Sequence, residues 1–362
     1  MKSRAESFTG KRIAPDALQD FSGRALRALG LPADCAEASA EVLVTTDTWG
    51  VYTHGTRQLL PLSRNLRGGA IRADSRPEIA GRHGGCILVD GRCAMPMVTA
   101  RVAMEAAIEQ ARKSGIAYAG VRHSSHFGAA GYYAVMAAEA GMIGIAMSNV
   151  DVCMSVPGSR SAVIGTNPIA FAVPSGDKHP VFLDIATSVV AVSKVLAAKA
   201  SGSPIPENWL IDDRGRQTAD AAAYPEHATI VPMAAHKGYG LALLIEILSG
   251  VLTGAGVLSQ VKCWLSDDAD PAGQGHAFLA LDVGSMMSGE AFCDRMTALC
   301  AELHSAPVAD GSDGVVLPGE IEWRRREDAL QNGLALPDYV LGNLFELAGE
   351  LDLTDDLEAA FS

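Results

Sequence analysis

Two histidines, His123 and His126, lie three residues apart between two apolar runs of the chain. The run before them, residues 116–121, predicts a strand, and the small-residue run after them, residues 129–140, predicts a helix. Polar side chains between a strand and the next helix occupy the place where α/β proteins usually carry their chemistry. Imidazole titrates near neutral pH, so both rings are candidates for proton transfer. The alternative for either ring is a hydrogen-bonded histidine of a loop or of the core.

Composition limits the class of protein and its partners. The chain has 362 residues, of which 48% are hydrophobic and 20% charged, as in globular proteins that bury a sizeable core. Its formal net charge is −13, which argues against nucleic acid and anionic membrane surfaces as partners. The one cluster of cations, Arg324-Arg325-Arg326, has acidic neighbours on both sides and predicts a solvated, salt-bridged helix face.

Seven cysteines are spread along the chain without a C-x-x-C pair, which favours reduced, cytoplasmic usage over a disulfide framework or a zinc site. The first residues lack the apolar segment of a signal peptide. Residues 238–256 are almost entirely apolar, but Glu246 lies near their middle, where an acid is costly in a membrane. We therefore expect a buried core helix there and no membrane partner.

The order of the predicted elements favours an α+β fold without a Rossmann domain. Helical patterns fill the first 70 residues and return from residue 290, and strand patterns lie between them. We expect a helical domain from residues 1–75 and 290–362, with a β-rich cofactor-binding domain, residues 76–289, inserted. The predicted strands are residues 86–89, 116–121, 142–147, 162–164, 169–173, 181–185 and 278–283. The predicted helices after residue 70 are residues 99–114, 129–140, 186–199, 238–252, 291–303, 320–331 and 337–351.

No nucleotide-binding fingerprint is present. Gly238-x-Gly240 is followed by Leu243 where a third glycine would stand, and Gly254-x-Gly256 ends in Ser259. Neither pair follows a predicted strand, and there is no phosphate-binding P-loop and no G-x-S-x-G elbow.

Two kinds of chemistry fit the histidine pair. A metal site could join the pair to His54, Asp151 and Asp184, but the spacing is unspecific and we expect no metal. Reduction of a carbonyl needs a proton donor, a pocket for a hydride carrier and a cation for a substrate carboxylate. A histidine suits the first task, and Arg57, close to His54, suits the last because its planar fork holds a carboxylate with two hydrogen bonds.

Six motifs in order along the chain then carry a resemblance to a known family. They are Thr53-His-Gly-Thr-Arg57, His126-Phe-Gly-Ala-Ala-Gly-Tyr-Tyr133, Gly165-Thr-Asn-Pro-Ile-Ala-Phe171, Asp184-Ile-Ala-Thr-Ser188, Lys237-Gly-Tyr-Gly-Leu241 with Glu246-Ile-Leu-Ser-Gly250, and Leu317-Pro-Gly-Glu320. Over roughly residues 15 to 350 the chain resembles the type-2 malate/L-lactate dehydrogenase family. Members of that family act on malate, ureidoglycolate, sulfolactate or diketogulonate, and some reduce cyclic imino acids.

The resemblance implies a role for individual residues. The family histidine that donates and accepts the proton falls on His126, which leaves His123 as a hydrogen-bonded structural residue. His54 and Arg57 are implied to bind substrate. The implied cofactor is NAD or NADP, without a Rossmann domain, and the protein is implied to be a homodimer whose site lies between two domains. The implied cofactor contacts are Ser148, Asp184, Ile185, Ala186, Lys237 and His276.

Two departures affect the substrate loop. Thr53 replaces the serine of the family, and Arg57 stands one residue early. Positions three and four after His54 share one face at a helix start, so we expect Arg57 to reach the substrate from its shifted position. The sequence thus predicts an NAD(P)-dependent oxidoreductase of small 2-hydroxy acids. A reductase of cyclic imino acids, a ureidoglycolate dehydrogenase, a metal-dependent hydrolase and a binding protein without turnover are the alternatives.

Overall fold

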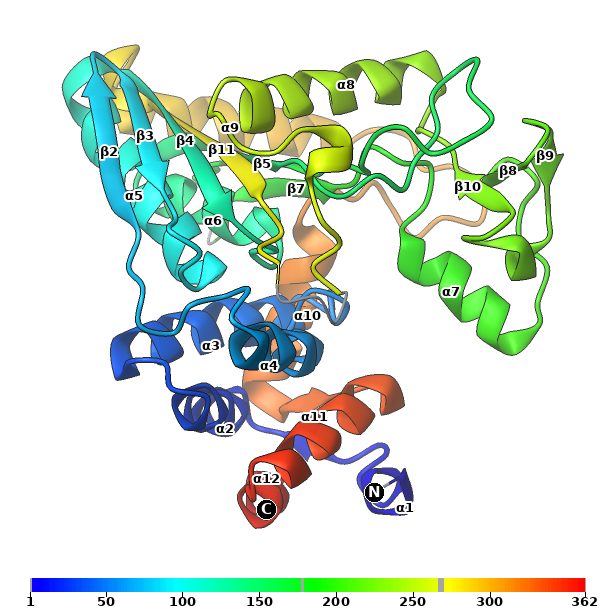
Figure 1. Cartoon of the computed structure of the whole chain (residues 1–362). Helices are drawn as coiled ribbons and strands as arrows, with labels where there is room; N and C mark the ends of the chain where they lie inside the picture. The colour runs from blue at the N-terminus through cyan, green and yellow to red at the C-terminus, as the bar shows by residue number, and fades with distance from the viewer. Residues whose placement is uncertain (1, 177–178, 266–269, 362) are drawn as a thin grey trace.

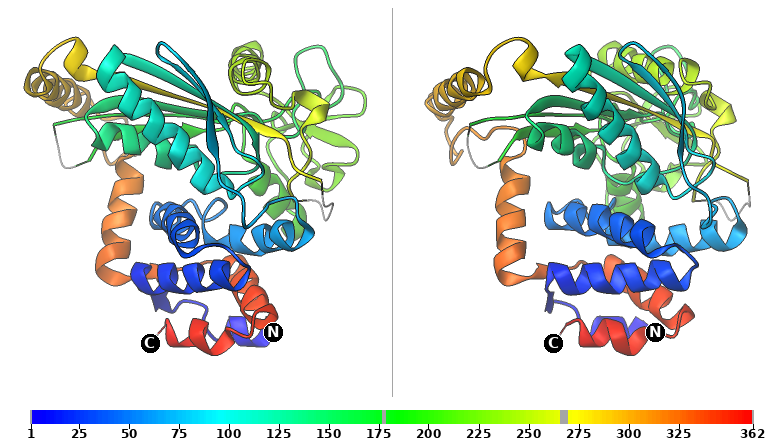
Figure 2. Two further views of the ribbon diagram at one scale, coloured as in Figure 1. Left: turned by 60° about the vertical axis from the view of Figure 1, so that its left-hand side comes forward. Right: turned by 90° about the vertical axis from the view of Figure 1, so that its left-hand side faces the viewer.

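A layer of helices lies against a layer built on a twisted sheet, and a small lobe projects beside them (Figure 1). The computed structural model describes residues 2–176, 179–265 and 270–361. The chain is a mixed α/β protein with a central sheet of seven strands. Both termini lie in the helical layer, on the side away from the sheet (Figure 1, Figure 2).

The helical layer combines the two ends of the chain. Its helices are α1 (Lys2–Glu6), α2 (Pro15–Ala28), α3 (Ala33–Thr48), α4 (Leu59–Gly68), α10 (Glu320–Asn332), α11 (Asp338–Glu350) and α12 (Thr354–Ala359). A short antiparallel pair, β1 (Arg12–Ile13) with β12 (Leu334–Ala335), joins the ends. The amphipathic pattern of α2 buries Leu18, Phe21 and Leu26, as its periodicity predicts.

The strand order of the sheet places its last strand in the centre. The order is β2 (Glu78–His83), β3 (Cys86–Asp90), β4 (Ile116–Ser124), β11 (Gln274–Asp282), β5 (Met142–Ser148), β6 (Ile169–Val173) and β7 (Val181–Ile185). Only β3 and β4 run parallel among these pairs, and the helix α5 (Pro96–Ser114) makes the crossover between them. All other neighbours are antiparallel.

Helices cover both faces of the sheet. The helices α5 and α6 (Ala130–Glu139) pack on the face that shares one continuous core with the helical layer. The opposite face carries α8 (His236–Glu246) and the π-helical turn η3 (Ile247–Val251), as Figure 1 shows. Trp49 of the helical layer packs on Phe182 of β7 and Trp323 of α10. The two layers therefore share side-chain packing, and groups that face each other between them are held rigidly.

The lobe beside the sheet was not predicted as a unit. It contains α7 (Val192–Ser201), β8 (Leu210–Asp212), β9 (Gln217–Thr218) and β10 (Ala228–Ile230) around a core of its own. Its strands are too short for periodicity to detect. The strand predicted at residues 162–164 is only an isolated bridge between Ile164 and Met154. The helix α9 (Gly289–His304) lies beside the sheet and away from the helical layer (Figure 1).

The prediction of a buried helix at residues 238–256 is only partly correct. The helix is α8 continued by η3, and Ile245 and Glu246 are buried. Leu244 and Val251, however, are 47% and 62% exposed. Within the described ranges, no helix is both long enough and apolar enough to cross a membrane.

Gly144→Ala should destabilise the fold, because β5 approaches α6 closely at this glycine. A Cβ there would overlap Ala134 O and lie 2.6 Å from Ala137 Cβ. Relief requires a shift of the helix, so we expect the free energy of unfolding to fall by about 1–3 kcal/mol. Urea denaturation measures it. Gly240→Ala in α8, where a Cβ meets nothing within 4 Å, is the matched control and should cause no loss.

Candidate active site

The candidate site residues converge where the sheet faces the helical layer. His126 follows the end of β4, Ser148 and Asp184 lie at the ends of β5 and β7, and His54 and Arg57 come from the connection between α3 and α4. Figure 1 shows this side of the sheet above the helical layer. Segments far apart in the sequence thus meet between the two layers.

The rings of His126 and His54 stack on one another. Their centroids are 5.4 Å apart, and the ring of Trp264 also stacks on His126, at 4.3 Å. Gly128 N donates a hydrogen bond of 3.3 Å to His126 Nδ1, which leaves Nε2 as the ring nitrogen for a ligand. Sequence reasoning missed Trp264, whose loop has no local signal.

Both imidazoles are kept neutral by their surroundings. Burial, and then the neighbouring His54 and His276, hold the pKa of His126 well below its usual range. Burial and the charge of Arg57 lower the pKa of His54 to about 4. Near neutral pH the pocket therefore holds two neutral rings close to the cation Arg57.

Arg57 is available to an anion. Its guanidinium lies 5.7 Å from the ring of Tyr339, and no carboxylate of the described residues forms an ion pair with it. Asn343 Nδ2 donates to Arg57 O at 3.3 Å and holds the backbone of the turn. Because the charge of Arg57 contributes to the lowered pKa of His54, the two residues lie close together. That they bind a substrate beside His126 stays a prediction.

An aromatic stack supports the loop of His126 from behind. Phe127 stacks on Tyr133 at 5.0 Å and on His276 at 4.3 Å, and Tyr133 Oη donates to Phe127 O at 2.6 Å. The motif that begins at His126 therefore folds back on itself, which fixes the direction of the catalytic candidate.

His276 and Ser148 are held inside the wall of the site. The register of β11 sets His276 opposite Ser148 on β5 and Val121 on β4. His276 Nδ1 lies 2.8 Å from Ser148 Oγ and its Nε2 lies 2.9 Å from Ser124 Oγ. Burial lowers the pKa of His276 to about 3. The contact of both residues with a cofactor remains a prediction.

Asp184 caps the helix α6 from the end of β7. Gly131 N donates to Asp184 Oδ2 at 2.7 Å, and a Cβ at Gly131 would lie 3.1 Å from the same oxygen. A carboxylate is stabilised by the positive end of a helix. Burial nevertheless raises the pKa of Asp184 to about 6. The close approach of this carboxyl group explains why a residue without a side chain, Gly131, ends the segment Phe127-Gly-Ala-Ala-Gly131.

Lys237 lies exposed in the first turn of α8, close to the segment that follows β7. Gly238 N donates to Met233 O, and Met233 N donates to Thr187 O, each at 2.9 Å. A Cβ at Gly238 would lie 2.7 Å from Thr187 O. The predicted cofactor residues Asp184, Ile185 and Ala186 thus adjoin the helix that carries Lys237.

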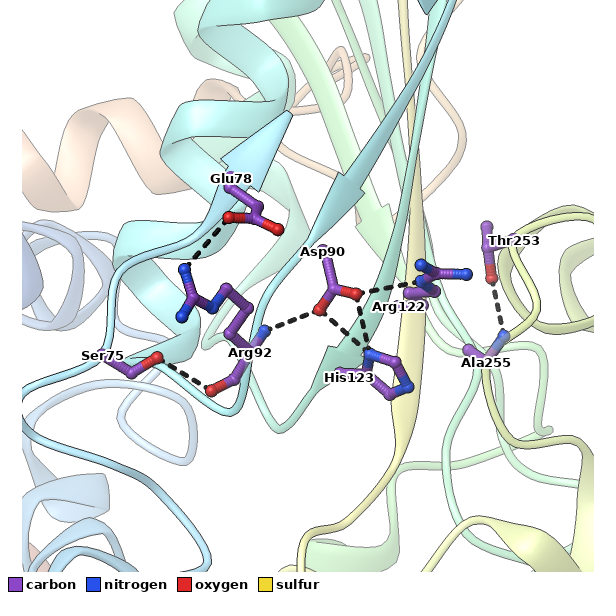
Figure 3. Close-up of polar contacts among 8 residues, drawn as sticks. All are labelled: Ser75, Glu78, Asp90, Arg92, Arg122, His123, Thr253 and Ala255. Carbon is purple, nitrogen blue, oxygen red and sulfur yellow. Dashed lines mark hydrogen bonds and ion pairs between the residues drawn. The ribbon is translucent and has the colours of Figure 1, made fainter. Parts of the chain in front are cut away.

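His123 belongs to a separate polar cluster around Asp90 (Figure 3). Its Nδ1 is 2.9 Å from Asp90 Oδ1, and Asp90 Oδ2 accepts from Arg122 Nε at 3.1 Å. Arg92 N donates to Asp90 Oδ1 at 3.0 Å. His123 is therefore a hydrogen-bonded residue at the end of β4, in agreement with the structural role predicted for it.

A buried acid, Glu246, joins its helix to three other segments of the chain. It accepts from Asn167 Nδ2 at 2.7 Å, from Leu258 N at 2.8 Å and from Asn149 Nδ2 at 3.2 Å. Asn149 Oδ1 in turn accepts from Gly275 N, next to His276. Sequence reasoning used Glu246 against a membrane span but did not assign it this function. An acid within an apolar run was the signal.

The arginine run of α10 is only partly the salt-bridged face that was predicted. Arg324 pairs with Glu320 at 3.4 Å. Arg326, however, donates to Thr48 Oγ1 at 2.9 Å, and the side chain of Arg325 lies over Gly50. The run therefore also attaches α10 to the end of α3.

Two observations bear on cofactors. No three His, Cys, Asp or Glu side chains of the described segments are grouped so that they could hold a metal ion, and Asp151 lies outside any such group. The hydroxyls of Ser125 and Thr187 are buried and lack a hydrogen-bond partner there. Both adjoin residues predicted to bind substrate or cofactor, His126 and Ala186, and a bound polar ligand would satisfy them.

Comparisons with known proteins agree with this architecture. Residues 13–344 match the family model described as malate/L-lactate dehydrogenase. A malate dehydrogenase of Pyrococcus abyssi is 34% identical over 93% of this chain and 94% of its own. An L-sulfolactate dehydrogenase of Methanothermobacter thermautotrophicus is 33% identical over 96% and 99%. The sulfolactate dehydrogenase structure of Methanocaldococcus jannaschii superposes with a TM-score of 0.88 at 32% identity, over 94% and 98% of the two chains.

The chain belongs to the malate/L-lactate dehydrogenase family, as the six motifs predicted. It is a dehydrogenase, an oxidoreductase that acts on CH–OH groups. Relatives named for NAD⁺ and for NADP⁺ both occur. A ureidoglycolate dehydrogenase (NAD⁺) of Escherichia coli is 32% identical over 91% of this chain and 93% of its own. A (2R)-3-sulfolactate dehydrogenase (NADP⁺) of Chromohalobacter salexigens is 33% identical over 88% and 93%.

Glu246→Gln should destabilise the protein, because the new amide group must face one of three hydrogen-bond donors. We expect the free energy of unfolding to fall by about 1–3 kcal/mol, as when a buried donor loses its acceptor. Denaturant titration measures it. Glu302→Gln on the exposed face of α9 is the control. Equal stability of the two variants would mean that the network around Glu246 does not hold these loops together.

Proposed function

We propose that this protein transfers a hydride between NAD or NADP and a small 2-hydroxy acid or its 2-oxo acid. The observation that carries the proposal is the stack of His126 on His54 close to Arg57, which forms no ion pair among the described residues. A proton-exchanging imidazole and a free guanidinium are what an α-hydroxy carboxylate requires.

Each pocket residue has one part in the proposed reaction. Arg57 binds the substrate carboxylate, and this contact orients the neighbouring carbon toward His126. His126 exchanges a proton with the hydroxyl or carbonyl oxygen at Nε2, since Gly128 N occupies Nδ1. His54 stacks against it and hydrogen-bonds the substrate. Trp264 stacks on His126 and keeps water from the ring.

The cofactor would lie along the strand ends of the sheet. The nicotinamide, when bound, supplies or accepts the hydride. Asp184 and Ile185 end β7 and Ala186 follows it, and Lys237 places a cation near this segment for an anionic part of the cofactor. Ser148 and His276 form the wall behind. The buried hydroxyls of Ser125 and Thr187 support a polar ligand at this position. In this arrangement residues 76–289 bind the cofactor and residues 1–75 with 290–362 complete the substrate pocket.

A second candidate function is reduction of a cyclic imino acid, or oxidation of ureidoglycolate. The structure of a Δ1-piperideine-2-carboxylate reductase of Pseudomonas syringae superposes with a TM-score of 0.83 at 27% identity, over 93% of this chain and 100% of its own. A C=N substrate needs the same carboxylate contact and the same proton. Assays of 2-hydroxy acids, 2-oxo acids and cyclic imines with both nicotinamide cofactors distinguish these functions. Cofactor binding with no turnover on the panel would favour a binding protein instead.

His126→Ala should reduce kcat by at least about 10³-fold, because the substrate oxygen loses its proton donor and acceptor. Cofactor affinity, measured by fluorescence titration, should remain near that of the wild type. The control is His123→Ala, since His123 lies outside the pocket and pairs with Asp90. Turnover that survives His126→Ala would exclude the mechanism.

The pH profile provides a companion measurement. Oxidation needs a neutral imidazole, and the pKa of His126 in the free protein lies well below 6.5. As the pH falls, kcat/KM for oxidation should hold its plateau through 6.5 and decline only at lower pH. A decline centred near 6.5 that disappears in His126→Gln would contradict the lowered pKa.

We propose in addition that the protein is a homodimer through the outer face of α8 and η3. Leu244, Val251 and Leu252 are 47%, 62% and 61% exposed there, and contiguous apolar surface marks interfaces. The double variant Leu244→Lys, Val251→Lys should be monomeric in sedimentation velocity. The control, Leu299→Lys with Leu303→Lys, changes equally exposed leucines of α9. A monomeric wild type would exclude the dimer.

A further inference from the structure

Asp47, in the last turn of α3, is a fully buried acid beside the candidate site. No lysine, arginine or histidine of the described residues forms an ion pair with it. Burial raises the pKa of Asp47 to about 7, against the opposing effect of its hydrogen bonds from Thr56. Burying a carboxyl group without a cationic partner costs free energy unless hydrogen bonds compensate for the lost water.

The side-chain hydrogen bonds described for Asp47 both come from the loop that carries the substrate residues. Its Oδ2 accepts from Thr56 N at 3.0 Å and from Thr56 Oγ1 at 2.5 Å. Thr56 is buried and begins the 3-10 turn η1 (Thr56–Gln58), which contains Arg57. The carboxyl group of Asp47, on α3, thus caps the start of this turn. It accepts the hydrogen bond of an amide that has no partner within the turn.

Gly55 makes a second contact with the same group. A Cβ on Gly55 would overlap Asp47 Oδ1 and Cγ, so the backbone between His54 and Thr56 packs directly against the carboxyl group. Any other residue would push the loop away from α3. Asp47 therefore holds the loop by hydrogen bonds on one side of Gly55 and by close packing at Gly55 itself.

We propose that Asp47 is a positioning residue, which sets His54 and Arg57 in the substrate pocket through Gly55 and Thr56 without touching the substrate. This inference rests on the proposed function of His54 and Arg57. A displacement of a binding group by about 1 Å can cost about 10²-fold in rate. The effect of losing Asp47 therefore falls on the substrate carboxylate and spares the cofactor.

The test compares Asp47→Ala and Thr56→Val with the wild type. Both variants should raise KM for the 2-hydroxy or 2-oxo acid at least tenfold, with a smaller change in kcat and an unchanged dissociation constant for NADH or NADPH. Asp47→Asn and Thr56→Ser, which keep an acceptor and a hydroxyl, should restore most of the substrate affinity. The matched control is Thr46→Val, one residue earlier on α3, where Thr46 Oγ1 donates only to Val42 O of its own helix.

Binding of oxamate, an unreactive analogue of a 2-oxo acid, gives a readout that does not need turnover. Calorimetry should show binding to the wild type with cofactor present and binding at least tenfold weaker to Asp47→Ala and Thr56→Val. If the wild type turns over no acid and binds no oxamate, the proposed function fails. If the wild type binds and both variants bind equally well, or if Thr46→Val weakens binding as much, the positioning function of Asp47 is excluded.

Discussion

The insertion of β11 between β4 and β5 is the constraint on which the site depends. This strand comes more than a hundred residues after β5, yet it pairs with both neighbours over most of its length. Without β11, no hydrogen-bonded strand would connect β4, which His126 follows, to β5, which ends at Ser148. The register of β11 sets His276 between Ser124 and Ser148, and the ring then stacks under Phe127. One long-range pairing thus positions Phe127 and, through it, the residue before it, His126.

Local pattern was sufficient for the elements that bury side chains at regular intervals. The strands at residues 169–173 and 181–185 have the predicted bounds, because each is a short, mostly apolar run that packs within the sheet. For β11 only the second half was predicted. Its first residues, Gln274, Gly275 and His276, are buried but carry side chains that do not indicate a strand. Their burial depends on partners such as Asn149 and Ser148, which no local window contains.

The site shows the same division between local motif and tertiary partner. The motif around His126 identified the proton-exchanging candidate because a family pattern marks it, and the structure separates it from His123 by placing the latter on Asp90. Trp264 could not be predicted, since its function is to lie against a ring that is far away in sequence. Glu246 was visible as an acid in an apolar run, whereas Asp47, among threonines, gave no such signal. Their partners, the amide of Asn167 and the backbone of Thr56, became apparent only in three dimensions.

Buried carboxyl groups, rather than salt bridges, hold the loops of this site. Asp47, Asp184 and Glu246 each accept a backbone N–H from a loop or helix start, at Thr56, Gly131 and Leu258. Amide dipoles stabilise a buried charge less fully than water does, so burial raises the pKa of Asp47 to about 7 and that of Asp184 to about 6. Both values exceed those of the unfolded chain, so the folded state binds more protons between about pH 4 and 7. The stability that these two groups contribute is therefore complete in acid and declines as the pH rises through this window. That is opposite in sign to the contribution of a salt-bridged surface aspartate such as Asp34, whose pKa is lowered beside Arg76.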